Sequence, residues 1–168
     1  MGLDVPATLR ASHPVPRTND AQRGRLTIIG REDASLKQIS RVRERAGIVH
    51  SPVSLVLAHC PEDVAGALRD APAGSLIANA TGLGKLSPGS PLSGAEAFPH
   101  DVLAWDFNYR GPLIFLRQAE EAGLRTEDGW DYFVAGWAAA LAAIGDVDLT
   151  EDVLLAMHAV SANLRPRG

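Results

Sequence analysis

The sequence predicts an α/β fold in which helices cover a parallel β-sheet on both faces. Short apolar runs alternate with helical patterns of about a dozen residues along most of the chain, which is typical of a parallel sheet. Several of these runs end in glycine or in polar residues, as buried strands do before a turn. The chain has 168 residues, of which 46% are hydrophobic and 21% are charged. This length and composition are those of one globular domain with a core of its own.

The predicted strands are four short apolar runs. The first, LTIIG at Leu26–Gly30, is rich in β-branched residues and is closed by glycine, as a buried strand should be. The other runs follow at Val53–Ala58, Ser75–Ala78 and Val102–Phe107. Because a parallel sheet binds ligands at the carboxyl ends of its strands, the loops after these runs are where a site is expected.

The predicted helices occupy the segments between these runs and the last third of the chain. In the first of them, apolar residues recur at spacings near three, which indicates an amphipathic helix. Pro61 and the two acidic residues after it are typical of a helix start, and Gly123 is placed like a C-cap. The predicted helices are 35–46, 61–71, 112–123, 130–144 and 151–164.

Residues 1–25 are expected to form an irregular leader, so that the folded domain spans 26–168. Pro6, Pro14 and Pro16 interrupt the leader, and polar residues fill much of the remainder. Its segment Ala7–Ala11, which contains no proline, has the composition of a poor strand.

The composition argues against several classes of function. The formal net charge is -4 and no basic stripe with interleaved aromatic residues appears, so no nucleic-acid partner is expected. No apolar run reaches the roughly 18 residues that a spanning helix needs. With no signal-peptide pattern, we expect a cytoplasmic location and no membrane partner. Cys60 is the single cysteine and the histidines lack metal-ligand spacing, so no disulfide and no metal site are expected.

One motif, NATGLGK at Asn79–Lys85, follows the third predicted strand directly. Glycine at positions 82 and 84 lets the backbone approach a flat or anionic ligand closely, while Asn79 and Thr81 supply hydrogen bonds. The glycines have a second interpretation, in which they serve only to form the turn.

Two further stretches repeat this pattern of polar and aromatic residues where strands should end, namely DFNY at 106–109 and DGWDYFVAGW at 128–137. In order and spacing, the three motifs resemble those of the shikimate dehydrogenase family, and the resemblance covers about Leu26 to Leu164. It implies an incomplete Rossmann-like parallel sheet flanked by helices, with the first strand and its glycine-rich turn missing. LTIIG is then the second strand of that fold, and the domain is a truncated NAD(P)-binding domain with C-terminal helices.

The resemblance also implies roles for single residues. Gly30 and Arg31 match the turn that holds the adenosine ribose and its 2′-phosphate. A guanidinium there binds the 2′-phosphate and so favours NADP, whereas the carboxylates of Glu32 and Asp33 suit the free 2′-hydroxyl of NAD. Arg31 also has a second interpretation, as a solvated surface charge. The turn residue Asn79 is also implied to bind the cofactor, as are the positions that match its nicotinamide end. Tyr109 matches the tyrosine that reaches the substrate. The implied nicotinamide-end positions are Thr81, Gly82, Phe107 and Gly129.

Departures from the family pattern leave the substrate open. Gly136 stands where the family carries a substrate-binding glutamine, and Lys85 reads as a loop charge because the family's catalytic lysine lies in its other domain. The aromatic residues after Gly129 are expected to pack between helices. They are Trp130, Tyr132, Phe133 and Trp137.

The expected function is hydride transfer between NADP and a cyclic hydroxy acid such as shikimate or 3-dehydroshikimate, in aromatic amino acid biosynthesis. No catalytic residue is assigned, because the catalytic lysine and aspartate belong to a domain that the resemblance does not include. A partner chain or a longer polypeptide would supply that domain. The gap in the sheet could be closed by direct pairing of its neighbours, by the leader, or by another chain, including a second copy. The alternative is a non-catalytic nucleotide-binding or interaction module.

Overall fold

The computed structural model describes residues 25–47, 52–85, 87–145 and 147–165. The chain divides into two compact units, Met1–Leu57 and Ala58–Gly168, which are taken separately below. Apart from Arg25, the expected leader lies outside the described residues. No described helix has the length and the apolar composition that a membrane-spanning segment requires.

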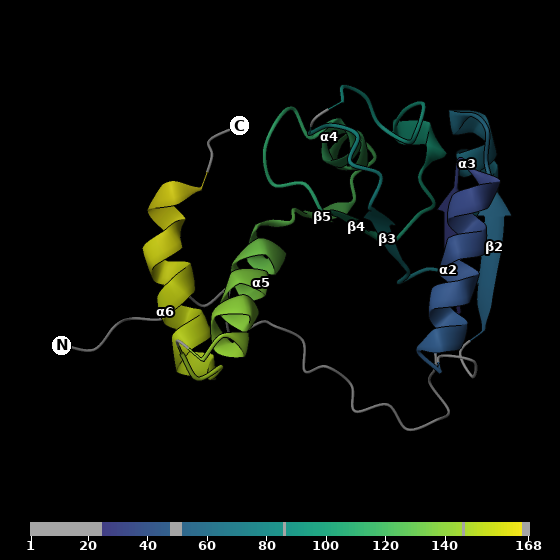
Figure 1. The fold of residues 1–168 in the computed structure, drawn as a ribbon. Helices are drawn as coiled ribbons and strands as arrows, with labels where there is room; N and C mark the ends of the chain where they lie inside the picture. Colours follow the sequence, from purple (N-terminus) through teal and green to yellow (C-terminus); the bar gives the residue numbers. More distant parts are fainter. Residues whose placement is uncertain (1–24, 48–51, 86, 146, 166–168) are drawn as a thin grey trace. The chain divides into compact units, whose positions relative to one another are not determined.

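The first unit contains a parallel pair of strands and the helix that connects them (Figure 1). Strand β1 (Leu26–Gly30) pairs with β2 (Val53–Leu57) from Leu26 opposite Val53 to Gly30 opposite Leu57. Helix α2 (Asp33–Arg45) buries Leu36. A Cβ atom on Gly30 would lie 2.8 Å from Leu36 Cδ2, so the glycine that closes β1 is what allows this leucine to pack there.

The second unit is built around a three-stranded parallel sheet in the order β3-β4-β5. Asn79, the last residue of β3, lies opposite Asp106, the last residue of β4. Helix α3 precedes this sheet, the 3₁₀-helix η2 lies between β3 and β4, and α4 connects β4 to β5. The bounds are α3 (Pro61–Leu68), β3 (Leu76–Asn79), η2 (Ala95–Ala97), β4 (Leu103–Asp106), α4 (Ile114–Glu121) and β5 (Arg125–Glu127).

The core of the second unit lies between this sheet and α4. The rings of Phe98 and Phe115 pack with their centroids 5.2 Å apart. Along β3, Ile77 is buried while Leu76 is exposed, which is the alternation of a strand with one face on the core. The buried cluster comprises Ile77, Leu92, Phe98, Val102, Ala104, Phe115, Leu116 and Ala119.

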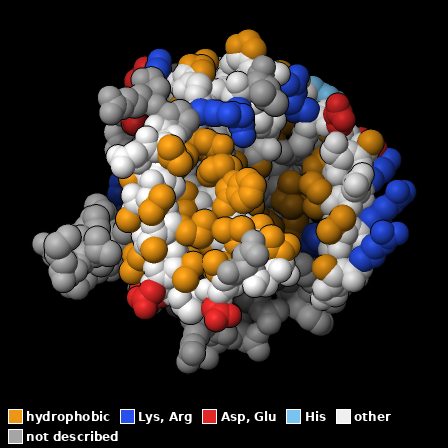
Figure 2. All heavy atoms as spheres, turned by 60° about the vertical axis from the view of Figure 1, so that its left-hand side comes forward, with side chains coloured by type: hydrophobic (Ala, Val, Ile, Leu, Met, Phe, Trp, Pro, Cys, Tyr) orange, Lys and Arg blue, Asp and Glu red, His pale blue; other side chains and the backbone are white. Residues whose placement is uncertain are grey.

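Two helices, α5 (Trp130–Ala143) and α6 (Glu151–Ser161), pack side by side at the end of the chain, and the 3₁₀-helix η3 (Ala162–Leu164) follows them (Figure 1). Along α5, residues four apart are buried, namely Trp130, Val134 and Ala138. The Thr150 hydroxyl caps α6 by accepting a hydrogen bond from the Val153 N–H at 3.2 Å. Figure 2 shows hydrophobic side chains gathered on the face of this helix pair that is turned toward the viewer.

The structure confirms the predicted fold class, and it also corrects several details. The four predicted strands are all present. Among the described residues they form two small sheets, β1-β2 and β3-β4-β5, instead of one.

Other bounds differ from the prediction. Strand β5 was not predicted, because its residues RTE form no apolar run. Helix α4 begins at Ile114 rather than at residue 112, since Leu113 has a left-handed backbone with φ of 45°. Helix α3 ends at Leu68 rather than at residue 71.

Candidate functional site

Three loops follow the strands β3, β4 and β5 at one edge of the sheet in the second unit. We call them the edge loops, and they comprise residues 79–85, 106–111 and 127–130. Because the strands are parallel, their carboxyl ends lie at the same edge, where ligands bind in such sheets. Hydrogen bonds of buried polar residues connect the edge loops to one another.

Asn79 organises the first edge loop from inside. Its side chain is 2% exposed, and its Oδ1 atom accepts hydrogen bonds from the Thr81 N–H at 3.1 Å and from the Thr81 hydroxyl at 2.7 Å. The Thr81 hydroxyl accepts in turn from the Leu83 N–H at 3.2 Å. The proton of this hydroxyl is therefore used within the turn, and Thr81 has no side-chain proton left to donate to a ligand.

Gly82 presents open backbone in the same loop. Its φ is +75°, a left-handed conformation that favours glycine, and a Cβ added to it would meet no atom within 4 Å. The backbone on this side of Gly82 is therefore open to solvent.

Asp106 connects the first edge loop to the second. The residue is fully buried, and its carboxylate accepts hydrogen bonds from Asn79 Nδ2 at 3.1 Å and from the Asn108 N–H at 2.9 Å. Burial raises the pKa of Asp106, while the hydrogen bonds from Asn108 and Asn79 oppose that rise. The hydrogen bonds thus hold a desolvated carboxyl group between the two strand ends.

Asn108 contacts both neighbouring loops, which makes it the central residue of the site. Its side-chain Nδ2 donates to the Leu83 carbonyl at 2.8 Å, and its backbone carbonyl accepts from the Gly129 N–H at 3.0 Å. Neither Asn108 nor Asp106 was among the predicted site residues. Their signal was present in DFNY, where two polar residues alternate with aromatic residues after a strand.

Gly129 marks a close backbone approach between the second and third edge loops. A Cβ atom at this position would lie 2.1 Å from the Phe107 carbonyl oxygen, so no other residue fits without a backbone shift. The neighbouring Asp128 holds the third loop through its carbonyl, which accepts from Trp105 Nε1 at 3.1 Å. The Asp128 carboxylate also accepts from the Trp130 N–H at 2.9 Å and from the Arg165 guanidinium.

Aromatic side chains fill the space between the second edge loop and α5. The Tyr109 ring lies 4.6 Å from that of Phe133 and 5.4 Å from that of Trp130. The half-buried Phe107 ring lies 4.3 Å from Trp105 and 5.0 Å from Tyr132. The aromatic residues of α5 were expected to pack between helices, and three of the four contact β4 or the loop after it. Trp137 contacts Phe133 within α5.

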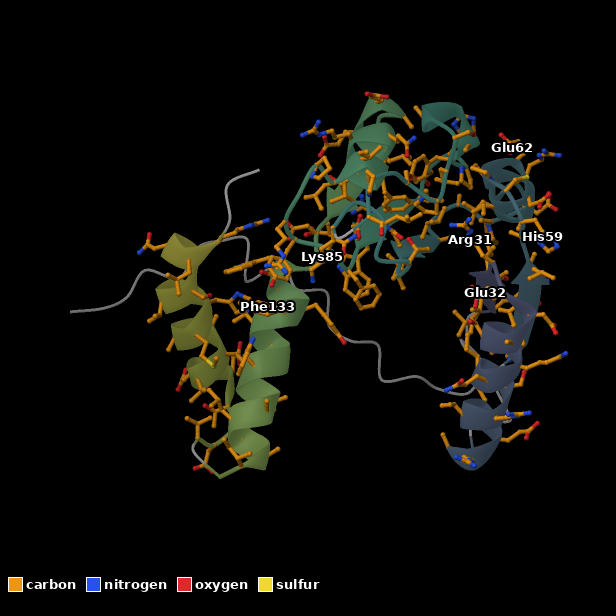
Figure 3. All side chains as sticks on the ribbon, turned by 45° about the horizontal axis from the view of Figure 1, so that its top comes forward. Arg31, Glu32, His59, Glu62, Lys85 and Phe133 are labelled. Atoms are coloured by element: carbon orange, nitrogen blue, oxygen red, sulfur yellow. The ribbon has the colours of Figure 1, made fainter. Side chains whose placement is uncertain are left out.

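Two cations lie near the Tyr109 ring. Lys85 Nζ is 5.2 Å and Arg110 Cζ is 5.9 Å from its centroid. Lys85 had been interpreted as a loop charge, and the structure places it against the tyrosine that matches the family's substrate contact. Figure 3 labels two neighbours of the Tyr109 ring, Lys85 and Phe133.

These loops belong to a fold that is also found in a solved enzyme structure. No family model and no curated protein matches the sequence. The crystal structure of a shikimate 5-dehydrogenase from Listeria monocytogenes, in complex with shikimate and NAD, is similar to this chain with a TM-score of 0.59. The match covers 77% of this chain at 18% identity. This chain has a dehydrogenase-like fold.

The similarity to the shikimate 5-dehydrogenase confirms the fold that the family resemblance implied. The match covers 45% of the dehydrogenase chain, so the present chain spans less than half of that enzyme's length. The predicted site residues of the second unit lie on the edge loops, at the end of the sheet where this class of fold binds ligands.

Gly30 and Arg31 belong to the first unit. Gly30 is the last residue of β1, and Arg31 is exposed in the turn before α2, where Figure 3 labels it beside Glu32. The site built from the edge loops therefore consists of residues of the second unit alone.

A polar pocket of about 350 Å³ lies beside the second and third edge loops. None of the predicted site residues lines it. Its charged lining residues are Arg117, Glu120, Glu127, Asp128, Asp131 and Arg165. Within the part of the chain that the structure describes, no group of His, Cys, Asp or Glu side chains is arranged to hold a metal ion.

Proposed function

We propose that this chain is the cofactor-binding part of an oxidoreductase of the shikimate dehydrogenase type, and that the edge loops hold the nicotinamide end of a dinucleotide. The observation that carries the proposal is the set of hydrogen bonds through which Asn79, Asp106 and Asn108 fix the edge loops at the carboxyl edge of the sheet. An edge held in this way is preorganised, so a ligand loses little binding energy in ordering it.

The residues present fit a flat nicotinamide ring. Gly82 exposes open backbone, and the half-buried Phe107 offers an aromatic surface at the next strand end. Thr81 would contribute through its backbone carbonyl, because its hydroxyl and its N–H both donate to Asn79. Gly129 would act indirectly, by letting the third loop approach Phe107.

The nicotinamide ring, when bound, supplies the hydride chemistry. The residues of this chain bind and orient the reactants, and Tyr109 reaches the substrate. For the substrate we propose a cyclic hydroxy acid such as shikimate or its ketone, 3-dehydroshikimate. Proton transfer falls to a lysine and an aspartate of a further domain or a partner chain, and the reaction would take place in the cytoplasm, in aromatic amino acid biosynthesis.

The choice of dinucleotide rests on the first unit. Arg31 is exposed directly after β1, and its guanidinium suits the 2′-phosphate of NADP. Glu32 follows it and favours the free 2′-hydroxyl of NAD. We propose NADP as the main cofactor, with NAD as a weaker ligand, and Arg31→Gln is expected to remove the difference between the two.

The experiment that tests the proposal is calorimetric titration of NADP and of NAD into the full chain and into a matched pair of variants. Gly82 and Gly74 both have a positive φ, of 75° and 77°, and an added Cβ meets no atom within 4 Å at either position. Gly82 lies on the carboxyl side of β3 and Gly74 on its amino side.

Valine at either position strains the backbone by a similar amount, about 1–3 kcal/mol, so both variants are expected to lose the same thermal stability. Only Gly82→Val is expected to weaken dinucleotide binding, by about tenfold or more, since about 1.4 kcal/mol of lost contact suffices. Equal weakening by both variants, or the absence of dinucleotide binding to the unmodified chain, would refute the proposal. Binding without turnover after the catalytic domain is supplied would favour the non-catalytic module.

A further inference from the structure

Lys85 and Arg110 come from different edge loops and meet at the same aromatic ring. Lys85 Nζ is 5.2 Å and Arg110 Cζ is 5.9 Å from the centroid of Tyr109. Both residues are exposed. A cation within about 6 Å of a ring centroid interacts favourably with its π-system, so the Tyr109 ring is a common neighbour of both charges.

The backbone brings these two residues together. Gly111, next to Arg110, lies so close to Gly84, next to Lys85, that a Cβ atom on Gly111 would be 2.6 Å from the Gly84 carbonyl oxygen. Gly111 has a φ of +86° and Gly84 a φ of +90°. The hydrogen bond from Asn108 Nδ2 to the Leu83 carbonyl adds a second link between the same two loops. The juxtaposition of the two cations is therefore built into the loops, and does not depend on the rotamers of their side chains alone.

Three acidic side chains of the edge loops and of the first turn of α5 have polar partners of their own. Asp106 is fully buried and hydrogen-bonded to Asn79 and Asn108. Asp128 forms an ion pair with Arg165, and an Asp131 carboxylate oxygen lies 3.5 Å from His158 Nδ1. No ion pair between Lys85 or Arg110 and a carboxylate occurs among the described residues. Two like charges near one ring repel each other, and an anion bound between them relieves this repulsion.

The chemistry of the pair favours an oxyanion. The guanidinium of an arginine binds a carboxylate through two parallel hydrogen bonds, and a lysine ammonium adds a point charge. The Tyr109 ring is half-buried against Trp130 and Phe133, and a carbon ring can pack on the part of it that remains exposed.

We propose that Lys85 and Arg110 together bind the carboxylate of a small cyclic acid that packs against Tyr109. This inference rests on the proposed function and deepens it, since it names the residues that recognise the acid group of the substrate. A bound dinucleotide carries oxyanions as well, in its pyrophosphate, and the experiment separates the two sources.

The test compares shikimate with shikimate methyl ester, which has the same ring without the negative charge. Each is titrated calorimetrically into the full chain at low salt, and NADP is titrated in a separate arm. The variants are Lys85→Gln and Arg110→Gln, and the matched control is Arg125→Gln, which removes an exposed charge at the start of β5. Thermal unfolding of each variant reports whether the fold is retained.

The unmodified chain and Arg125→Gln are expected to bind the acid at least about tenfold more tightly than the ester, as one charge-assisted hydrogen bond provides. Lys85→Gln and Arg110→Gln are expected to bind both forms with similar, weaker affinity. Lys85→Arg is expected to restore the preference for the acid. A merely structural role for the two cations would leave the ratio of acid to ester affinity unchanged.

Three outcomes would overturn the proposal. One is a chain that does not distinguish acid from ester, or that binds neither. Another is a preference for the acid that remains in both Lys85→Gln and Arg110→Gln. The third is that these substitutions lower only the affinity for NADP, which would assign the cations to the pyrophosphate. NADP binding by the unmodified chain is measured independently of these results, so the proposed carboxylate site can be refuted while the proposed function is retained.

Discussion

Asn79 and Asp106 lie opposite each other at the last positions of two paired strands, and the Asn79 side-chain amide donates to the Asp106 carboxylate at 3.1 Å. Both residues are buried, and each also holds the loop that follows its own strand. The pair therefore couples the geometry of the first edge loop to that of the second.

Asn79→Asp is expected to destabilise the protein at neutral pH by about 2–3 kcal/mol, because it replaces a buried donor with a second carboxylate. The pKa of the resulting acid pair is raised above that of the unfolded chain, so the stability is retained at low pH and lost as the pH rises. Urea unfolding at pH 4 and pH 7 measures this difference. The control is Asn163→Asp, which adds the same charge at an exposed position, and a similar pH dependence in both variants would contradict the explanation.

Asp106→Asn is expected to cost about 1–2 kcal/mol, because its new amide would face that of Asn79. In the unmodified protein, burial raises the pKa of Asp106 above its ordinary value of 3.8. Its contribution to stability is therefore full below pH 3.8 and is lost as the pH rises through the folded-state pKa. The difference between the unfolding free energies of the unmodified protein and Asp106→Asn, measured across this pH range, isolates the contribution of Asp106. The difference should shrink as the pH increases, and a difference that grows would show that the sign is wrong.

Asn108→Ala is expected to lower the stability by about 1–3 kcal/mol and to loosen the first edge loop, because the Leu83 carbonyl loses its donor at 2.8 Å and keeps only the longer hydrogen bond from Asn79 Nδ2, at 3.5 Å. Hydrogen exchange should become faster across residues 79–85 and remain unchanged in α6. Uniform acceleration throughout the second unit would indicate a general loss of stability instead of a local one.

Gly129→Ala is expected to prevent normal folding or to cost more than about 3 kcal/mol, since the new methyl group would lie 2.1 Å from the Phe107 carbonyl oxygen. Gly136→Ala provides the control, because an added Cβ meets no atom within 4 Å at that position inside α5. Alanine in a helix interior is expected to stabilise the protein by up to about 1 kcal/mol. Thermal unfolding distinguishes the two, and comparable effects would contradict the close approach.

Local sequence patterns predicted the strands that carry apolar runs and the polar turn that closes β3. They did not predict β5, because RTE is short, lies at the edge of its sheet and contains no apolar residue. Asn79 was identified because its turn chemistry is local. Its pairing with Asp106 depends on the register between β3 and β4, which no spacing within either segment reveals.

The same limit applies to Lys85 and Asn108. Lys85 lies near Tyr109 because Gly111 and Gly84 approach each other, and that approach is a tertiary contact. Asn108 links all the edge loops through one amide and one carbonyl, yet in the sequence it is a single polar residue between two aromatic ones. Sequence patterns therefore located the end of the sheet that carries the site, and the structure supplied the residues that hold it together.

The Trp105 indole donates to the Asp128 carbonyl and packs against Phe107 in a tilted arrangement, which places an intrinsic fluorophore beside the proposed nicotinamide position. Its emission depends on the polarity around the ring and on nearby absorbers. Reduced nicotinamide absorbs where tryptophan emits, so energy transfer to a bound coenzyme would make this protein its own optical sensor, with no added label.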